Sequence, residues 1–303
     1  MRIEQEYNPE LQERLRQVRT LVFDVDQCLS PGPVELDSVL DQLASQYDII
    51  PCTSRSYGEM EAESYPGKDV LLSSPNGIFE AGLVIKKNGD ARPSCDPAAL
   101  EKLIEIKSRL QSEFIPIGSR SKADKYQFIN EPADPNSYGT FPKIQGSTNP
   151  LPFTFSNYQG QLSLIMWPSG TARECPLGFN YFACAEYVES MREKDQQLFE
   201  NVSILRTDGS VLIRPNGPRG RPITKLRGVQ QLENQKILKP STTLFLGDDE
   251  QMDLAVAEYV KENGGFVITP DNAADQMKKA ADMILPGNAG VAVLPFLQML
   301  LKL

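Results

Sequence analysis

The chain has 303 residues, with 31 lysines and arginines against 40 aspartates and glutamates and no histidine, so its formal net charge is −9. The acidic balance argues against broad binding to nucleic acids or anionic membranes. Without histidine there is no Ser-His-Asp catalysis and no histidine metal ligand. The five cysteines include no CxxC pair, which disfavours a disulfide framework or a cysteine zinc site.

No apolar stretch approaches the ~18 residues of a membrane-spanning helix, and residues 1–19 are charged rather than signal-like. We therefore expect a cytoplasmic protein that contacts no membrane. The sequence leaves its oligomeric state, monomer or dimer, open.

In the N-terminal third, short apolar runs alternate with helical patterns. A charged helical pattern over 8–18 precedes the apolar run 20–23, and a second helical pattern over 35–46 precedes the run 48–52. Short apolar runs of this kind are typical of strands buried on both faces. We interpret residues 70–72 as a third strand. The alternation predicts a parallel α/β sheet.

The C-terminal part repeats this alternation. The expected elements are a helix over 225–235, a strand over 243–246, a helix over 252–263, a strand over 266–268, a helix over 272–281 and a strand over 283–285. Together the two ends of the chain predict one α/β domain with a parallel sheet flanked by helices.

The middle of the chain has a different composition. Helical patterns cover 97–113 and 179–199, whereas 115–160 is rich in Pro, Ser, Asn and Gly and favours loops with short strands. Residues 161–167 have the pattern of a strand, and Asp208-Gly209 between two apolar runs predicts a hairpin. We therefore expect a Rossmann-like core over 1–88 and 215–303, interrupted by an α+β domain over 89–214.

Polar residues follow the first two expected strands. Asp24-Val25-Asp26 follows the first, and Thr53-Ser54-Arg55 follows the second. Because ligands of open parallel sheets bind beyond the carboxyl ends of the strands, these side chains are expected near one crevice. A carboxylate can attack phosphorus while a second one transfers a proton. Taken separately, the first tripeptide also fits a solvated loop and the second a helix N-cap.

Two further groups come from the C-terminal part. Lys225 begins a helix and offers a point charge to a phosphate and a nucleophilic carboxylate. Asp248 and Asp253 belong to the acidic string 247–253 at the end of a strand, and carboxylate oxygens suit Mg²⁺. The simpler interpretations are a surface lysine and an acidic turn that caps a helix.

The order of these pieces resembles the haloacid dehalogenase-like (HAD) phosphatase superfamily: strand then D-x-D, strand then Thr, a helix-initial Lys, and strand then G-D-x-x-x-x-D. Residues 74–78 and 281–285 resemble the branch with a large α/β cap after the third core strand. The core and the passage 214–225 resemble trehalose-phosphate, sucrose-phosphate and mannosyl-phosphoglycerate phosphatases. The resemblance implies Mg²⁺-dependent hydrolysis of a small phosphorylated metabolite, with a sugar phosphate as the leading substrate.

The resemblance also implies residue roles. Asp24 would be the nucleophile that forms an aspartyl-phosphate, and Asp26 would protonate the leaving alcohol and then activate water. The phosphate-binding residues would be Thr53, Ser54 and Lys225. The metal residues would be Asp24, Asp26 through its backbone carbonyl, Asp248 and, in support, Asp253, with Asp249 as the competing candidate. The inserted domain would be the cap that supplies most substrate contacts.

Three positions depart from the superfamily pattern. Gln27 and Cys28 stand where Gly and Thr are usual, and Ser54 stands where Gly is usual. Two alternatives therefore stay open beside the phosphatase: a catalytically silent HAD-like protein that binds a phosphorylated ligand or a partner, and a sugar phosphomutase. Cys28 and Cys52 could form a redox-sensing pair, although free cysteines are often simply buried.

Overall fold

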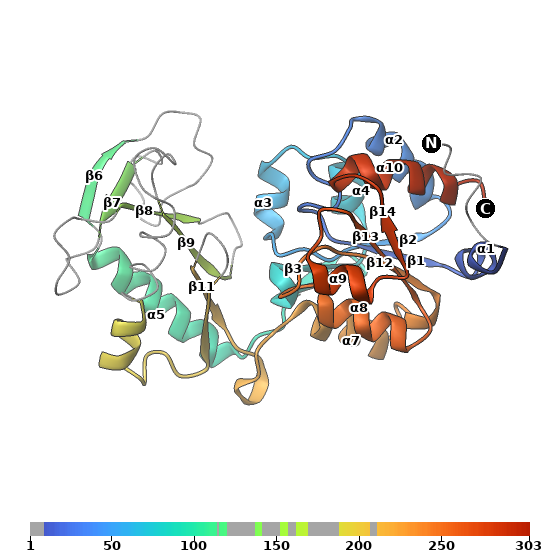
Figure 1. Ribbon diagram of the computed structural model, residues 1–303. Helices are drawn as coiled ribbons and strands as arrows, with labels where there is room; N and C mark the ends of the chain where they lie inside the picture. The colour runs from blue at the N-terminus through green and yellow to red at the C-terminus, as the bar shows by residue number, and fades with distance from the viewer. Residues whose placement is uncertain are drawn as a thin grey trace. The chain divides into compact units, whose positions relative to one another are not determined.

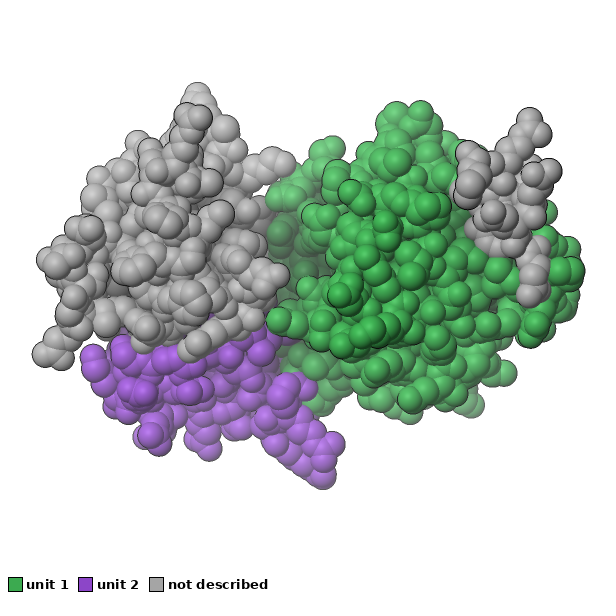
Figure 2. Space-filling view, in the orientation of Figure 1, with its two compact units in different colours: residues 1–94, 223–303 green, residues 95–222 purple. Residues whose placement is uncertain are grey.

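The computed structural model describes residues 9–113, 115–119, 137–140, 152–156, 162–168, 188–206 and 211–303. The chain divides into two compact units, coloured separately in Figure 2. Unit 1 comprises residues 1–94 and 223–303, and unit 2 comprises residues 95–222. The divisions expected from the sequence, after residue 88 and before residue 215, lie slightly earlier in the chain.

Unit 1 is built on a five-stranded sheet in the order β14-β13-β12-β1-β2, with every pairing parallel. The strands are β1 (Thr20–Phe23), β2 (Asp48–Pro51), β12 (Thr243–Leu246), β13 (Phe266–Pro270) and β14 (Met283–Leu285). The last residue of β1, Phe23, pairs with Leu246 of β12 and Pro51 of β2. The residues that follow these three strands therefore emerge side by side at one edge.

Helices cover both faces of this sheet (Figure 1). The helices of unit 1 are α1 (Pro9–Arg16), α2 (Glu35–Ala44), α3 (Tyr57–Ala62), α4 (Lys68–Ser73), α7 (Lys225–Asn234), α8 (Leu254–Glu262), α9 (Asp275–Ala280) and α10 (Ala289–Leu300), with 3-10 turns at Glu80–Gly82 and Pro240–Thr242.

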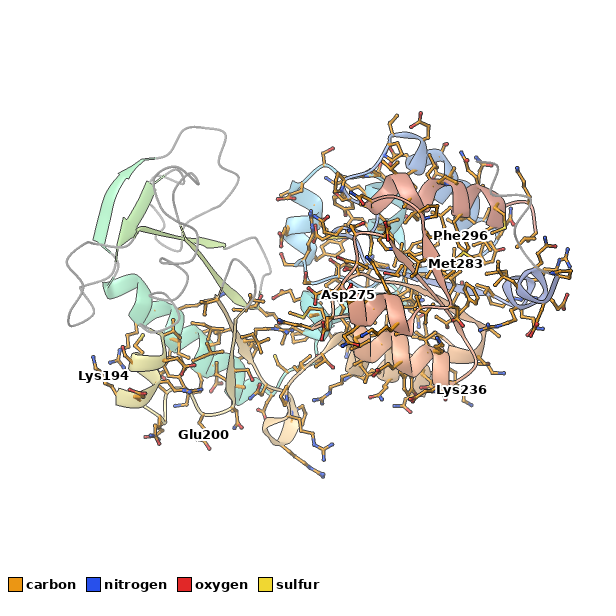
Figure 3. All side chains as sticks on the ribbon, viewed as in Figure 1. Lys194, Glu200, Lys236, Asp275, Met283 and Phe296 are labelled. Carbon is orange, nitrogen blue, oxygen red and sulfur yellow. The ribbon has the colours of Figure 1, made fainter. Side chains whose placement is uncertain are left out.

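The alternation of side chains along β1 produces two hydrophobic layers. Leu21 and Phe23 belong to the layer formed with α2, α4 and α10, whereas Val22 belongs to the layer formed with α7, α8 and α9. Phe296 and Met283, labelled in Figure 3, are part of the first layer. Burial on both faces explains why these strands are short, continuous apolar runs.

The expected strand over 70–72 is wrong, because these residues belong to α4. A three-residue apolar run does not distinguish a strand from a buried helical turn, and α4 packs against α2 and β2. Gly67 precedes α4 with a φ of 76°, and a Cβ there would lie 2.2 Å from Leu40 Cδ1. Only glycine combines this left-handed backbone with so close an approach.

The third strand of the chain is instead β3 (Gly77–Phe79), which forms an antiparallel sheet with β4 (Val84–Lys87) and β5 (Asp90–Pro93). A parallel bridge between Cys52 and Ile78 joins β3 to the end of β2.

Unit 2 contains α5 (Pro97–Glu113), which packs on an antiparallel sheet in the order β10-β11-β9-β8-β7-β6. The strands are β6 (Ile115–Ser119), β7 (Ser137–Thr140), β8 (Pro152–Ser156), β9 (Leu164–Pro168), β10 (Val202–Arg206) and β11 (Val211–Pro215), and a 3-10 turn follows at Pro218–Gly220. The expected hairpin of β10 and β11 is confirmed.

The helix expected over 179–199 is found in part. Residues 188–194 are helical and 195–199 are not, whereas 179–187 lie outside the described residues. The expected fold class, a parallel α/β core with an inserted α+β unit, is confirmed. None of the helices among the described residues has both the length and the apolar character that crossing a bilayer requires.

Candidate active site

A buried lysine joins two carboxylates, one directly after β1 and the other directly before α8. Asp24 directly follows β1, and its N–H donates to the Leu246 carbonyl at 2.9 Å, which extends the strand pairing by one residue. Lys225, the first residue of α7, places Nζ 3.0 Å from Asp24 Oδ1 and 2.7 Å from Asp253 Oδ1. All three side chains are almost completely buried. The Lys225 ammonium group therefore forms buried ion pairs with the two carboxylates rather than solvent-exposed ones.

Asp253 also fixes the loop that carries Asp248. Its Oδ2 accepts the backbone N–H groups of Asp248 at 3.1 Å and Asp249 at 3.2 Å. Asp249 is exposed, and its Oδ1 accepts the N–H groups of the next turn. Of the two candidates for a supporting carboxylate, the structure therefore brings Asp253 into the cluster and leaves Asp249 as a turn-capping residue.

Replacement of Gly247 by alanine is expected to displace Asp253. A Cβ at Gly247 would lie 2.8 Å from Asp253 Cβ and 2.9 Å from its Cγ, in a fully buried side chain that cannot swing away. We expect Gly247→Ala to lower the free energy of unfolding by about 1–3 kcal/mol, as overpacking typically does. Urea unfolding of both proteins measures this change, and equal stabilities would show that Asp253 can move without cost.

Two carboxylates and one thiol gather beside this cluster. One ligand-capable atom each of Asp24, Cys28 and Asp248 lies within 4.8 Å of the other two. The two hydrogen bonds at Asp24, from Val25 N at 2.8 Å and from Lys225, both use Oδ1. No group in the described part of the chain donates to Asp24 Oδ2, which leaves this oxygen available for a metal or for attack. Carboxylate oxygens fit Mg²⁺, which prefers hard oxygen ligands.

Carboxylates outnumber cations in this cluster. Burial raises the pKa of Asp24 well above its usual value, the Lys225 charge opposes this, and neighbouring carboxylates add to it. Burial lowers the pKa of Lys225, but the charges of Asp24 and Asp253 outweigh this effect and raise it. Lys225 therefore stays protonated, and a further divalent cation would offset the remaining negative charge.

The affinity for Mg²⁺ is expected to rise with pH. Burial and the Asp253 charge raise the pKa of Asp248 to about 7, although its hydrogen bond from Cys28 opposes the shift. Because a protonated carboxyl group does not bind the metal, the binding-competent fraction increases about tenfold between pH 6 and pH 8. Calorimetric titration with Mg²⁺ at these two pH values measures the change, and an equal affinity at both would contradict this pKa.

The raised pKa also affects the metal-free protein. Because the folded state keeps a proton that the unfolded chain releases at lower pH, the contribution of Asp248 to stability is present in acid. It is lost as the pH rises from about 4 to about 7.

Asp26 is paired with Arg55. Arg55 Nε lies 3.1 Å and 2.9 Å from the two carboxylate oxygens of Asp26, and Nη2 also donates to Oδ1. Arg55 Nη1 donates to Glu63 at 2.7 Å, and its guanidinium carbon lies 5.4 Å from the centre of the Tyr65 ring. The fork of the guanidinium therefore fixes the orientation of the Asp26 carboxylate. This pair was not predicted from the sequence, since no local spacing connects residues 29 positions apart.

Thr53 follows β2 and is fully buried. Its N–H donates to the Ile78 carbonyl at 2.9 Å, and its Oγ1 accepts the N–H of Arg55 at 3.1 Å. The N-cap of α3 is Ser56, whose Oγ accepts the Glu59 N–H, so the alternative interpretation of Thr53 as a cap is wrong. Among the described residues, no hydrogen bond connects Thr53 or the half-buried Ser54 to the carboxylate cluster.

Gln27 adopts the backbone conformation that glycine usually supplies. Its φ is 55°, and its N–H donates to the Ser30 carbonyl at 2.7 Å. Its own carbonyl accepts from Asn272 Nδ2 at 3.2 Å. The left-handed conformation costs a non-glycine residue about 1–2 kcal/mol, but the turn after β1 is formed. Gln27 thus forms a hydrogen-bonded turn after β1 in spite of its side chain.

Comparisons with known proteins found no matching family model and no matching curated protein. Several solved structures do match over nearly the whole chain. A haloacid dehalogenase-like hydrolase from Bacteroides thetaiotaomicron has 12% identity and a TM-score of 0.57, with 94% of this chain and 99% of that chain covered. A proposed HAD/COF-like hydrolase from Plasmodium vivax has 17% identity and a TM-score of 0.57, with 96% and 98% covered.

A further protein from Bacteroides thetaiotaomicron, analysed among phosphatases of the haloalkanoate (HAD) superfamily, has 13% identity and a TM-score of 0.51, with 94% of this chain and 95% of that chain covered. At identities this low, the structural similarity establishes the fold alone. The chain therefore has the fold of the haloacid dehalogenase-like hydrolases, a parallel α/β core with an inserted domain.

Proposed function

We propose that the chain is a Mg²⁺-dependent phosphatase of the HAD superfamily that hydrolyses a small phosphate monoester through an aspartyl-phosphate on Asp24. The observation that carries the proposal is the buried Lys225 ammonium between Asp24 and Asp253, with Asp248 beside them at the adjacent strand end. The fold supports the same reaction class, since the solved structures that share it include proteins described as hydrolases and phosphatases.

In this proposal Asp24 Oδ2 attacks the phosphorus atom, because Oδ1 already accepts two hydrogen bonds. The new O–P bond forms as the bond to the leaving alcohol breaks, and Asp26 gives its proton to the alcohol oxygen. A water molecule then attacks the aspartyl-phosphate, Asp26 takes a proton from this water, and inorganic phosphate leaves. The Asp24 carboxylate is restored.

The remaining residues position these groups and offset charge. Lys225 neutralises part of the negative charge that a phosphate dianion brings next to Asp24. Arg55 contacts both oxygens of the Asp26 carboxylate and so orients it for the second step, in which this carboxylate accepts the proton of the attacking water. Thr53 and Ser54 are proposed to contact the phosphoryl oxygens beyond the end of β2.

Mg²⁺ would be held by the side chains of Asp24 and Asp248 and by the backbone carbonyl of Asp26. When bound, it supplies positive charge to the phosphoryl oxygens. Asp253 would act indirectly, since its hydrogen bonds hold the loop that carries Asp248.

We propose that unit 2 is the cap that selects the substrate, and that the substrate is a small phosphorylated metabolite, with sugar phosphates as the leading class. The net charge of −9 disfavours nucleic acids as partners. Oligomeric state does not enter the mechanism, because every residue named in it belongs to one chain.

The test is phosphate release from a panel of sugar phosphates, phosphoglycerates, nucleotides and an aryl phosphate, with Mg²⁺ and with a chelator. We expect release that requires Mg²⁺, with a sugar phosphate as the best ester. If metal-loaded protein releases phosphate from none of them, the proposal fails. The alternative of a catalytically silent, ligand- or partner-binding protein would then be favoured, although the formed turn at Gln27 does not support it. An isomerised sugar phosphate without free phosphate would identify a phosphomutase instead.

A further inference from the structure

The side chain of Cys28 lies inside the proposed metal site. Its Sγ donates to Asp248 Oδ1 at 3.4 Å, and it belongs with Asp24 and Asp248 to the group of ligand-capable atoms within 4.8 Å of one another. Ligand atoms bound tetrahedrally to one zinc ion at about 2.0–2.3 Å lie about 3.3–3.8 Å from each other. The 3.4 Å between Cys28 Sγ and Asp248 Oδ1 is in this range, and the whole group lies within 4.8 Å.

The backbone fixes this placement of the thiol. The N–H groups of Leu29 and Ser30 both donate to the Val25 carbonyl, at 2.9 Å and 2.8 Å, which folds the turn after β1 back over the strand end. Cys28 is fully buried within this turn. Many buried cysteines serve only as small apolar side chains, but the Sγ of Cys28 is hydrogen-bonded to a carboxylate next to a second one.

A second observation points to a cation at the same place. The Asp24 side chain is only 6% exposed, yet no described residue donates a hydrogen bond to its Oδ2. With Asp248 and Asp253 nearby, Lys225 alone does not offset the carboxylate charge of the cluster. A carboxylate oxygen that accepts no hydrogen bond from the described residues is a position that a cation or a water molecule can occupy.

We infer that this site also binds a thiophilic divalent cation such as Zn²⁺ or Co²⁺, with Cys28 Sγ as a protein ligand beside Asp24 and Asp248. The inference rests on the proposed function in that both place one metal ion between Asp24 and Asp248. Thiolate sulfur favours zinc and related ions over Mg²⁺, which takes oxygen ligands. On binding, the S–H bond breaks, its proton passes to water, and a sulfur electron pair forms the metal–sulfur bond without any oxidation or reduction.

The test is the absorption spectrum of the wild-type protein titrated with Co²⁺, followed by calorimetric titrations with Zn²⁺ and with Mg²⁺. We expect a sulfur-to-cobalt charge-transfer band that is absent in Cys28→Ser, and Zn²⁺ binding at least about tenfold weaker in that variant. Mg²⁺ affinity should change much less. Cys95→Ser, which removes a thiol from unit 2, is the matched control and should keep the band.

A wild-type protein without the band at saturating Co²⁺ would overturn the inference, even if Cys28→Ser failed to fold. So would a band that persists in Cys28→Ser, because it would come from one of the other four cysteines. These outcomes are independent of turnover. A band that requires Cys28 in a protein that releases no phosphate would contradict the proposed function and leave the inference standing.

Discussion

Replacement of Asp24 by asparagine is expected to lower phosphate release from the best ester by at least about 10⁴-fold, the scale seen when a catalytic nucleophile is removed. An amide oxygen cannot form the aspartyl-phosphate, and it carries no charge to bind the metal. The fold should persist, because an amide Oδ1 can still accept from Val25 N and Lys225. Initial rates at saturating Mg²⁺, with circular dichroism to verify folding, measure the effect.

Asp249→Asn is the matched control for this substitution. It makes the same change of carboxylate to amide a short distance away, on an exposed residue whose Oδ1 only caps a turn. Because asparagine can accept the same two backbone N–H groups, its rate should stay within about twofold of wild type. A folded Asp24→Asn protein that keeps more than about one-hundredth of the wild-type rate would contradict a nucleophilic role for Asp24.

Replacement of Lys225 by methionine is expected to have the largest effect on stability. Methionine has nearly the same length and fills the buried space, but it leaves Asp24 and Asp253 without their cation. Removing one partner of a buried ion pair costs about 3–5 kcal/mol, because the remaining charges are buried without compensation. The free energy of unfolding, from urea titrations of metal-free protein, measures this loss.

Two comparisons isolate the ion pairs. Lys239→Met makes the same substitution at an exposed lysine and should change the free energy of unfolding by no more than about 0.5 kcal/mol. Adding Asp253→Asn to Lys225→Met removes one uncompensated charge, so the double variant should be more stable than the sum of the single changes predicts. Strict additivity, or a loss below about 1 kcal/mol for Lys225→Met, would contradict direct charge pairing.

Buried strands and the residues at their ends were the most predictable part of the molecule. The runs that became β1 and β12 are buried at every position and, after an initial threonine, apolar, because both faces are covered. Asp24 directly follows β1, and Asp248 follows β12 after Gly247. Because parallel strands end at one edge, the grouping of Asp24 with Asp248 followed from the pattern. Lys225, the first residue of a helix, was expected to offer a charge to a phosphate and to the nucleophilic carboxylate. It is buried between Asp24 and Asp253.

Contacts between distant segments were less predictable. The segment 70–72 is too short for periodicity to separate strand from helix, and its packing against α2 decides the outcome. The pairing of Arg55 with Asp26 depends on how two loops meet, which no local spacing encodes. The same holds for Asp253, where only the fold showed that its carboxylate, rather than that of Asp249, contacts Lys225.

The most direct test of the account is to locate the phosphoryl group on the chain. Protein turning over its best ester with Mg²⁺ is quenched in acid, digested with trypsin, and the peptide spanning residues 20–55 is examined by mass spectrometry. We expect a phosphorylated peptide with the modification on Asp24, absent from Asp24→Asn and from samples without Mg²⁺. Phosphate release without this modification, or with the phosphoryl group on another residue, would contradict Asp24 as the nucleophile.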